Sequence, residues 1–197
     1  SQGGGVFNSV YGYYSGDTAT AILTINNSTI SGNNASSGGG VINHERGGFG
    51  AAGDYASITL NRSLVSGNSA STGAEVQDIA SNGMITANNF NLFGHSGLSN
   101  AQAFVNFSPS GSDLTATSDG SIPTALAGIL DTTLQNNGGD TETHNLVSGS
   151  PALDAVTDGS SPATDQRGVS RPQGAGGDIG AVELQANQSI FLPLIFK

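Results

Sequence analysis

Carboxylates are the side chains of this chain that could most readily do chemistry. Asp54, Glu75 and Asp78 lie beside the strands predicted below. Glycoside hydrolysis needs two carboxyl groups that face each other across a cleft, and the spacing of these three residues matches no recognised pair. We interpret them as scattered, solvated carboxylates, and the sequence predicts a protein without a catalytic site.

The basic residues and the histidines support the same interpretation. Polysaccharide lyases use a cationic base or a cluster of Arg and Lys side chains, often with calcium, but the basic side chains here are few and dispersed. The histidines also stand apart, with no HxH or HExxH spacing that would indicate a transition-metal site. These residues are Arg46, Arg62, Arg167, Arg171 and Lys197, with His44, His95 and His144.

Calcium is the one ion that the residue pattern leaves to consider, and no other cofactor is expected. Asp154, Asp158, Asp165 and Asp178 occupy a loop-rich segment, and oxygen ligands from such loops suit calcium. The chain has no EF-hand or nonapeptide calcium repeat, so the sequence predicts no metal site beyond this possibility.

Charge and composition restrict the partners and the location. The 5 basic and 15 acidic residues give a net charge of −10, which a phosphate backbone would repel, so no nucleic-acid partner is expected. No apolar run is long enough to span a bilayer, and the chain has no cysteine. The chain starts at Ser1 without Met, which fits a processed, exported product. We expect an extracellular or cell-surface location.

A repeat of 35 residues is the strongest feature of the sequence. Residues 25–43 recur without a gap at residues 60–78, and residues 3–8 match residues 38–43. Such self-similarity is typical of repeat architectures. Each copy contains short strands with period two, such as 23–25 and 58–60, separated by Gly-rich turns.

This pattern predicts an all-β fold, a right-handed parallel β-helix in which each strand pairs with its equivalent one repeat away. Val41 should then lie over Val76, with Leu23 over Ile58 among the inward-facing residues. The amides of Asn33 and Asn68 should form a ladder, in turns where Asn tolerates left-handed backbone geometry. An antiparallel sandwich is the alternative; it explains the short strands but not the ungapped repeat.

The later parts of the chain differ from the repeats. We expect β-helix repeats over residues 1–110, a loop-rich capping segment over 111–183, and a linker with an apolar β-strand over 184–197. A decayed third copy of the repeat runs through residues 84–94.

Four motifs follow one another in the C-terminal half: residues 134–144, 149–154, 164–173 and 178–183. Together they resemble the C-terminal region of the choice-of-anchor Q family of bacterial surface proteins, over about residues 84–183. The resemblance implies an extracellular, pectate-lyase-like right-handed β-helix, usually followed by a variable anchoring tail. It implies no catalytic residues.

Charged residues of these motifs are candidates for a structural cap. Asp165, Arg167, Arg171 and Asp178 carry opposite charges in a Gly- and Pro-rich segment. If paired with one another, they would fix the loops that close one end of the β-helix.

The C-terminal tail is the candidate for assembly. An apolar segment of this kind would aggregate if it were left in water, whereas the first repeat offers an open strand edge. We therefore expect a non-enzymatic, extracellular homopolymer in which the tail of one subunit docks on Gly3, Gly4, Gly5, Val6, Phe7 and Asn8 of the next. The tail strand comprises Ser189, Ile190, Phe191, Leu192, Pro193, Leu194, Ile195, Phe196 and Lys197.

Several alternatives stay open at this point. The chain could bind or cleave a surface carbohydrate, or it could be an adhesin fragment of a larger anchored protein. The tail could also fold back on its own flank or be the remnant of a sorting signal.

Overall fold

Short strands rich in β-branched residues pair in parallel with their equivalents further along the chain. The computed structural model describes residues 1–12, 18–46 and 53–185. One short helix, α1 (Asn100–Ala103), and one 3-10 turn, η1 (Leu126–Gly128), accompany the strands. The strands are β1 (Val6–Val10), β2 (Thr20–Asn26), β3 (Thr29–Ile30), β4 (Val41–Glu45), β5 (Tyr55–Asn61), β6 (Leu64–Val65), β7 (Val76–Asp78), β8 (Ile85–Ala87), β9 (Leu92–Phe93), β10 (Phe104–Val105) and β11 (Leu114–Thr115).

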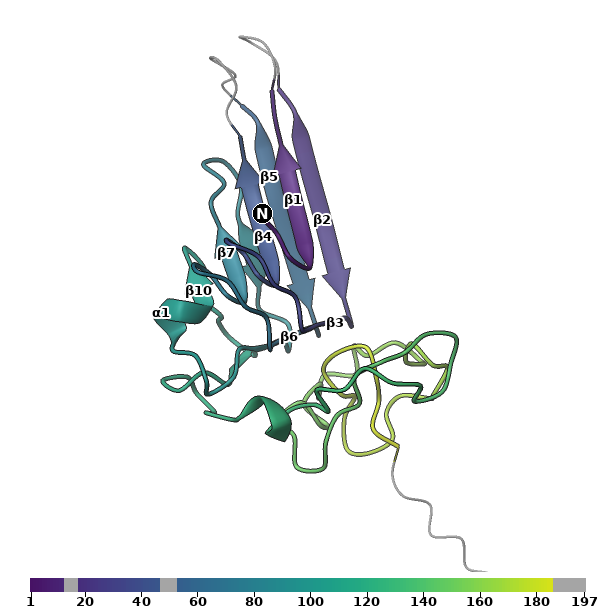
Figure 1. Cartoon of the computed structure of the whole chain (residues 1–197). Coiled ribbons are helices and arrows are strands. Elements are labelled where there is room, and N and C mark those ends of the chain that lie inside the picture. Colours follow the sequence, from purple (N-terminus) through teal and green to yellow (C-terminus); the bar gives the residue numbers. More distant parts are fainter. Residues whose placement is uncertain (13–17, 47–52, 186–197) are drawn as a thin grey trace, which may run out of the picture.

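These strands form three parallel sheets, which the chain visits in turn. The first sheet has the order β1-β4-β7-β10, the second β2-β5-β8, and the third β11-β9-β6-β3. Consecutive strands therefore belong to different sheets, and β4 returns to pair with β1 (Figure 1). The expectation of an all-β fold with parallel pairing is confirmed, and the antiparallel sandwich is wrong.

The register of the sheets follows the repeat in the sequence. Val41 pairs with Val76, and Leu23 pairs with Ile58, as predicted. The equivalent side chains then contact one another within the main core, where Val41, Ile58 and Val76 are fully buried. From β8 onward the spacing between paired residues shortens from 35 to 27 or 28, and then to 22 between β9 and β11, because shorter connections link the strands.

Aromatic side chains pack at the last strands of the stack. Phe93 in β9 and Phe104 in β10 lie with their ring centroids 6.2 Å apart. Phe107, which follows β10, contacts both rings edge-on at 5.2 and 5.7 Å. These three rings form the end of the main core, a feature that the sequence analysis missed.

The segment after β11 packs on the side of the third sheet. Figure 1 shows its loops, in green and yellow, beside β3 and β6. The main-chain N–H of Gly180 donates to the carbonyl of Arg62 at 2.9 Å, and that of Ala181 donates to Thr29 Oγ1 at 3.1 Å. A second core joins the outward-facing Leu64, Leu92 and Ala116 to Ile129, Leu130, Leu146, Ala152, Val156, Ile179 and Val182.

Most of this segment therefore lies on the side of the stack, whereas residues 119–124 lie at its end, beside β11, Phe104 and Phe107; closure of the stack by the segment stays a prediction. The side chains of each two-residue strand in the third sheet point to opposite faces. In β6, for example, Val65 lies in the main core and Leu64 lies in the second core. Because both faces of this sheet are apolar, both must be covered, and the C-terminal segment covers the outer one.

The turns differ from the prediction in one detail. Left-handed backbone falls on Gly32 and Gly67, with φ of 72° and 84°, and not on the asparagines that follow them. Glycine adopts this conformation without the steric cost of a Cβ atom, so Asn33 and Asn68 are left to contribute their amides.

The buried register can be tested at Val76. Val76→Asp places an unpaired carboxylate in the main core, so we expect a loss of several kcal/mol in the free energy of unfolding, measured by urea denaturation. Thr24→Asp, at an exposed position of β2, should change it by less than about 0.5 kcal/mol. Equal stability of the two variants would contradict the register.

Candidate functional site

The first repeat, made of β1, β2 and β3, presents an open edge in every sheet. Among residues 1–12, 18–46 and 53–185, each of these strands ends its sheet and pairs on one side only. Apolar side chains are exposed along two of them: Phe7 is 44% exposed and Ile22 is 69% exposed. Val6 is only partly buried, whereas its partner Val41 is fully buried. A further repeat placed on this edge would bury the same surface that every inner repeat buries.

The predicted acceptor, residues 3–8, is dominated by close backbone stacking. The N–H of Gly4 donates to the carbonyl of Gly38 at 3.1 Å, and that of Gly5 donates to Gly39 at 3.0 Å. A Cβ atom on Gly4 would collide with the carbonyl oxygen of Gly39, and one on Gly5 would lie 2.8 Å from that of Gly40. Close stacking of the first two repeats therefore favours glycine at these positions, whereas the third repeat carries Ala74 and Glu75 there and still donates their N–H groups to Gln102 and Ala103.

Three ladders of side-chain amides run between the repeats. The more exposed one runs from the third repeat to the first: Asn89 Nδ2 donates to Asn61 Oδ1 at 3.3 Å, and Asn61 Nδ2 donates to Asn26 Oδ1 at 2.8 Å. The other two ladders end at buried carboxylates.

In the first of these two buried ladders, Asn33 Nδ2 donates to Asn68 Oδ1 at 3.0 Å, which confirms the predicted pair, and Asn68 Nδ2 donates to Glu75 Oε2 at 2.7 Å. The sequence analysis missed the second buried ladder, although the matching Asn8 and Asn43 of the repeat could have indicated it.

This second buried ladder lies under the first sheet. Asn8 Nδ2 donates to Asn43 Oδ1 at 2.8 Å, and Asn43 Nδ2 donates to Asp78 Oδ1 at 3.2 Å. Both buried ladders thus run in one direction, from the first repeat toward a buried carboxylate in the third. Because a carboxylate only accepts, it orients every amide before it.

The carboxylates considered as catalytic candidates are all buried, so their interpretation as solvated groups is wrong. Asp54 and Glu75 are fully buried and Asp78 is 8% exposed. Asp54 accepts hydrogen bonds from the N–H groups of Gly12 at 2.5 Å and Ala19 at 2.9 Å. These side chains satisfy the chain's own backbone groups and are not paired across a cleft.

Glu75 is the most perturbed of these groups. Its carboxylate accepts from the N–H of Gly67 at 2.9 Å and from the Asn68 amide. These hydrogen bonds favour the charged form, but burial outweighs them and raises the pKa of Glu75 from 4.5 to about 7.

Ion pairs hold the C-terminal segment. Arg167 pairs with Asp165 at 2.7 Å, and Arg171 pairs with Glu183 at 3.3 Å. Arg171 also donates to the carbonyls of Asp178 at 2.5 Å and Gly180 at 2.8 Å. Glu183 was not among the candidate residues, although it ends the last of the four motifs. These charges fix loops that have no helix or sheet of their own.

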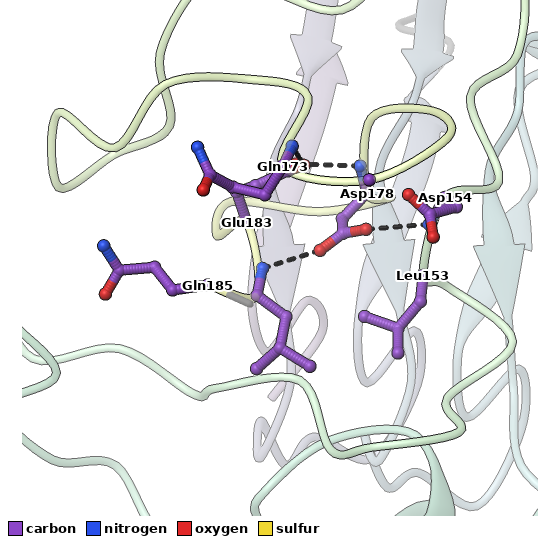
Figure 2. A pocket seen from close by; sticks show the side chains of 8 residues that line it. Leu153, Asp154, Gln173, Asp178, Glu183 and Gln185 are labelled. Carbon is purple, nitrogen blue, oxygen red and sulfur yellow. Dashed lines mark hydrogen bonds between the residues drawn. The ribbon is translucent and has the colours of Figure 1, made fainter. Parts of the chain in front are cut away.

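Asp178 lies beside the ion pair of Arg171 and Glu183, at a hollow of about 170 Å³. Its carboxylate accepts from the N–H groups of Asp154 at 2.8 Å and Leu184 at 2.7 Å, and its own N–H donates to Glu183 (Figure 2). Burial, together with the nearby charges of Glu183 and Asp154, raises the pKa of Asp178 to about 6.

The structure does not gather the four aspartates considered for calcium. Asp165 is paired with Arg167, and Asp158 is exposed and accepts from the N–H of Ser160. Over residues 1–12, 18–46 and 53–185, no three His, Cys, Asp or Glu side chains form a group that could hold a metal ion.

The predicted assembly strand, residues 189–197, lies outside the described residues. Among the residues that the structure does describe, no helix has the length and apolar character needed to cross a membrane. Comparison of the chain with protein-family models, curated proteins and solved structures finds no match.

The pKa of Glu75 predicts a pH dependence of stability. Because the folded state binds the Glu75 proton more tightly than the unfolded state, the free energy of unfolding is highest below pH 4.5. It falls as the pH rises from 4.5 through about 7, where Glu75 ionises in the folded protein. Glu75→Gln removes the ionisation, so its stability relative to the parent should improve by about 3 kcal/mol between pH 4 and pH 8. Urea denaturation across this range measures the difference.

The control is Glu142→Gln, which removes the same charge at an exposed position. Its difference from the parent should stay constant over the same pH range. A constant difference for Glu75→Gln as well would mean that burial does not control the ionisation of Glu75.

Arg171 allows a test of the ion pairs. Arg171→Ala leaves Glu183 buried without its charge partner, so we expect a loss of about 3–5 kcal/mol, with faster hydrogen exchange over residues 126–183. Arg46→Ala, at an exposed arginine, serves as the control and should cost less than about 0.5 kcal/mol. Unchanged exchange in the first variant would show that these charges do not hold the segment.

Proposed function

We propose that this chain is a right-handed parallel β-helix of the choice-of-anchor Q kind and serves as a non-enzymatic, extracellular structural protein. In this proposal it is a subunit of a surface fibre or another homopolymer, assembled head to tail, in which the C-terminal strand docks on the first repeat of a neighbour.

The order of the strands supports the helical architecture. The chain passes through the three sheets in succession and returns to the first with a parallel partner. The in-register pairing at 35 residues is what successive turns of one solenoid require. A cell-surface location fits the acidic, cysteine-free composition.

The open first repeat is the observation that carries the assembly proposal. All three sheets end on β1, β2 and β3, so unpaired backbone groups and apolar side chains occur together on one face. Strand edges of this kind pair readily with another chain. A contact between the tail of one subunit and the first repeat of another is head to tail, so it propagates as a fibre or closes as a ring.

The absence of catalysis is part of the proposal. In its support, Asp54, Glu75 and Asp78 are buried and accept hydrogen bonds from groups of the chain's own repeats, in part from the preceding one. The basic side chains stay few and dispersed.

Carbohydrate binding is the alternative function. The place that suits it best is a hollow of about 420 Å³ beside the aromatic end of the main core, where Phe107 lies near Asn100 and Asp119. Aromatic faces with amide and carboxylate groups are the side chains that sugar recognition uses.

Deletion of residues 187–197 tests the assembly. We expect the truncated protein to keep its β-sheet circular dichroism and to elute as a monomer, while the full chain forms larger species under negative-stain microscopy. A matched control replaces residues 189–197 with a Gly/Ser segment of equal length and should also stay monomeric. Unchanged assembly after truncation, or a full chain that is itself monomeric, would contradict the proposal.

A further inference from the structure

We infer that β2, and not the predicted segment 3–8, is the strand on which the tail of a second copy docks, with Leu192 over Leu23 and Pro193 over Thr24. This inference rests on the proposed function and specifies its contact. It follows from four features: the stacking glycines, the buried amide ladder of β1, the direction of the backbone N–H groups in β5, and the shortness of β3.

The stacked glycines count against β1 as the acceptor. In the repeat, a Cβ atom on Gly39 would collide with the carbonyl oxygen of Ala74, and one on Gly4 with that of Gly39. The third repeat carries Ala74 and Glu75 at these positions and still donates their N–H groups to Gln102 and Ala103, so the glycines favour close stacking but do not by themselves exclude β1. The tail has no glycine between residues 186 and 197.

The buried amide ladder of β1 excludes it as the acceptor. Asn8 uses its Nδ2 group for Asn43 at 2.8 Å and for two carbonyls of the second sheet. A side chain stacked on Asn8 must then be a donor, as Asn8 itself is toward Asn43. Residues 190–196 are all apolar and carry no such donor.

The edge of β2, unlike that of β1, presents mainly apolar side chains, and these suit the apolar tail. β2 is seven residues long, and its side chains alternate between exposed and more buried positions. Leu23 and Ile25 belong to the main core, and Ile22 is 69% exposed. An apolar strand can cover residues 21–25 here without stacked glycines, and the amide ladder of β2 lies at its exposed last residue, Asn26, which accepts from Asn61 at 2.8 Å.

The direction of the N–H groups sets the register. In β5 the outward-facing Tyr55 donates its N–H to Ala19 of the first repeat, at 2.9 Å. The fully buried Ala56 and Ile58 donate theirs toward the third repeat, to Asn82 at 3.1 Å and Met84 at 3.2 Å. Outward-facing residues thus point their N–H groups to the earlier repeat and inward-facing residues to the later one.

Proline therefore fits an added strand only at an outward-facing position, where its missing N–H would point away from β2. With Pro193 outward over Thr24, period two turns Ile190, Leu192 and Leu194 inward, over Ala21, Leu23 and Ile25. Phe191 then covers the exposed Ile22. In the register shifted by one residue, Pro193 would remove a hydrogen bond to β2.

The third edge is short. β3 has two residues, and on its outer face Thr29 Oγ1 accepts a hydrogen bond from the N–H of Ala181 in the C-terminal segment. Among the described residues, β2 is the one strand of the three that combines length with apolar core-facing side chains.

Disulfide trapping tests this contact, since the natural chain has no cysteine. Full-length Phe191→Cys is mixed with full-length Ile22→Cys and oxidised mildly. Paired residues of adjacent strands lie within the Cα separation of about 4.4–6.8 Å that a disulfide needs, so we expect a covalent dimer as the main product. The matched control, Phe191→Cys mixed with Phe7→Cys, also offers an exposed apolar edge position and should give at least tenfold less dimer.

A proline pair tests the register independently. Leu194→Pro puts a second proline at an inward position and should raise the concentration needed for assembly about tenfold, because a ladder hydrogen bond is lost. Ile195→Pro puts it at an outward position and should change that concentration less than about threefold. Equal effects would overturn the register.

The outcomes separate this inference from the proposed function. Trapping through Phe7→Cys in place of Ile22→Cys would mean that the tail docks on β1, so the assembly would hold and the choice of β2 would be wrong. Assembly of the full chain with neither pair trapped would also overturn the inference. A full chain that stays monomeric at every concentration would overturn both.

Discussion

In-register parallel pairing between equivalent strands is the interaction on which the rest of this structure depends. It places Val41 between Val6 and Val76, and Ile58 between Leu23 and Ile85, so that an apolar residue recurs at each stacked position of the core. The same pairing brings Gly39 so close to Ala74 that no Cβ atom fits between the repeats. A single change at a stacked position therefore affects the repeats on both sides.

The polar interior follows from this stacking. Asparagines that recur at one level can hydrogen-bond to each other only as a ladder, because each amide has both a donor and an acceptor. Asp78 and Glu75 accept from the last amide of the two buried ladders and so orient them. The burial of Glu75, which raises its pKa to about 7, is the cost of ending a ladder inside the protein.

The C-terminal segment solves a different problem. The third sheet is apolar on both faces, and its outer leucines, Leu64 and Leu92, need cover that the repeats cannot provide. The C-terminal segment, which has little regular sheet or helix, covers these leucines. Its loops are held by the ion pairs Arg171–Glu183 and Asp165–Arg167 in place of a backbone hydrogen-bond ladder. The open edge of the first repeat is left without such cover, which is why we place the proposed assembly contact there.

The 35-residue repeat by itself determined the parallel pairing, the register of Val41 on Val76 and the Asn33–Asn68 ladder, because identical residues at a constant spacing can stack in one way only. Tertiary structure decided what the spacing does not encode. The burial of Asp54, Glu75 and Asp78 depends on which face of each turn points inward, and the pairing of Arg171 with Glu183 depends on loops without a period. The position of most of the C-terminal segment against the third sheet depends on the apolar surface that the folded repeats leave exposed, and that surface exists only after they have stacked.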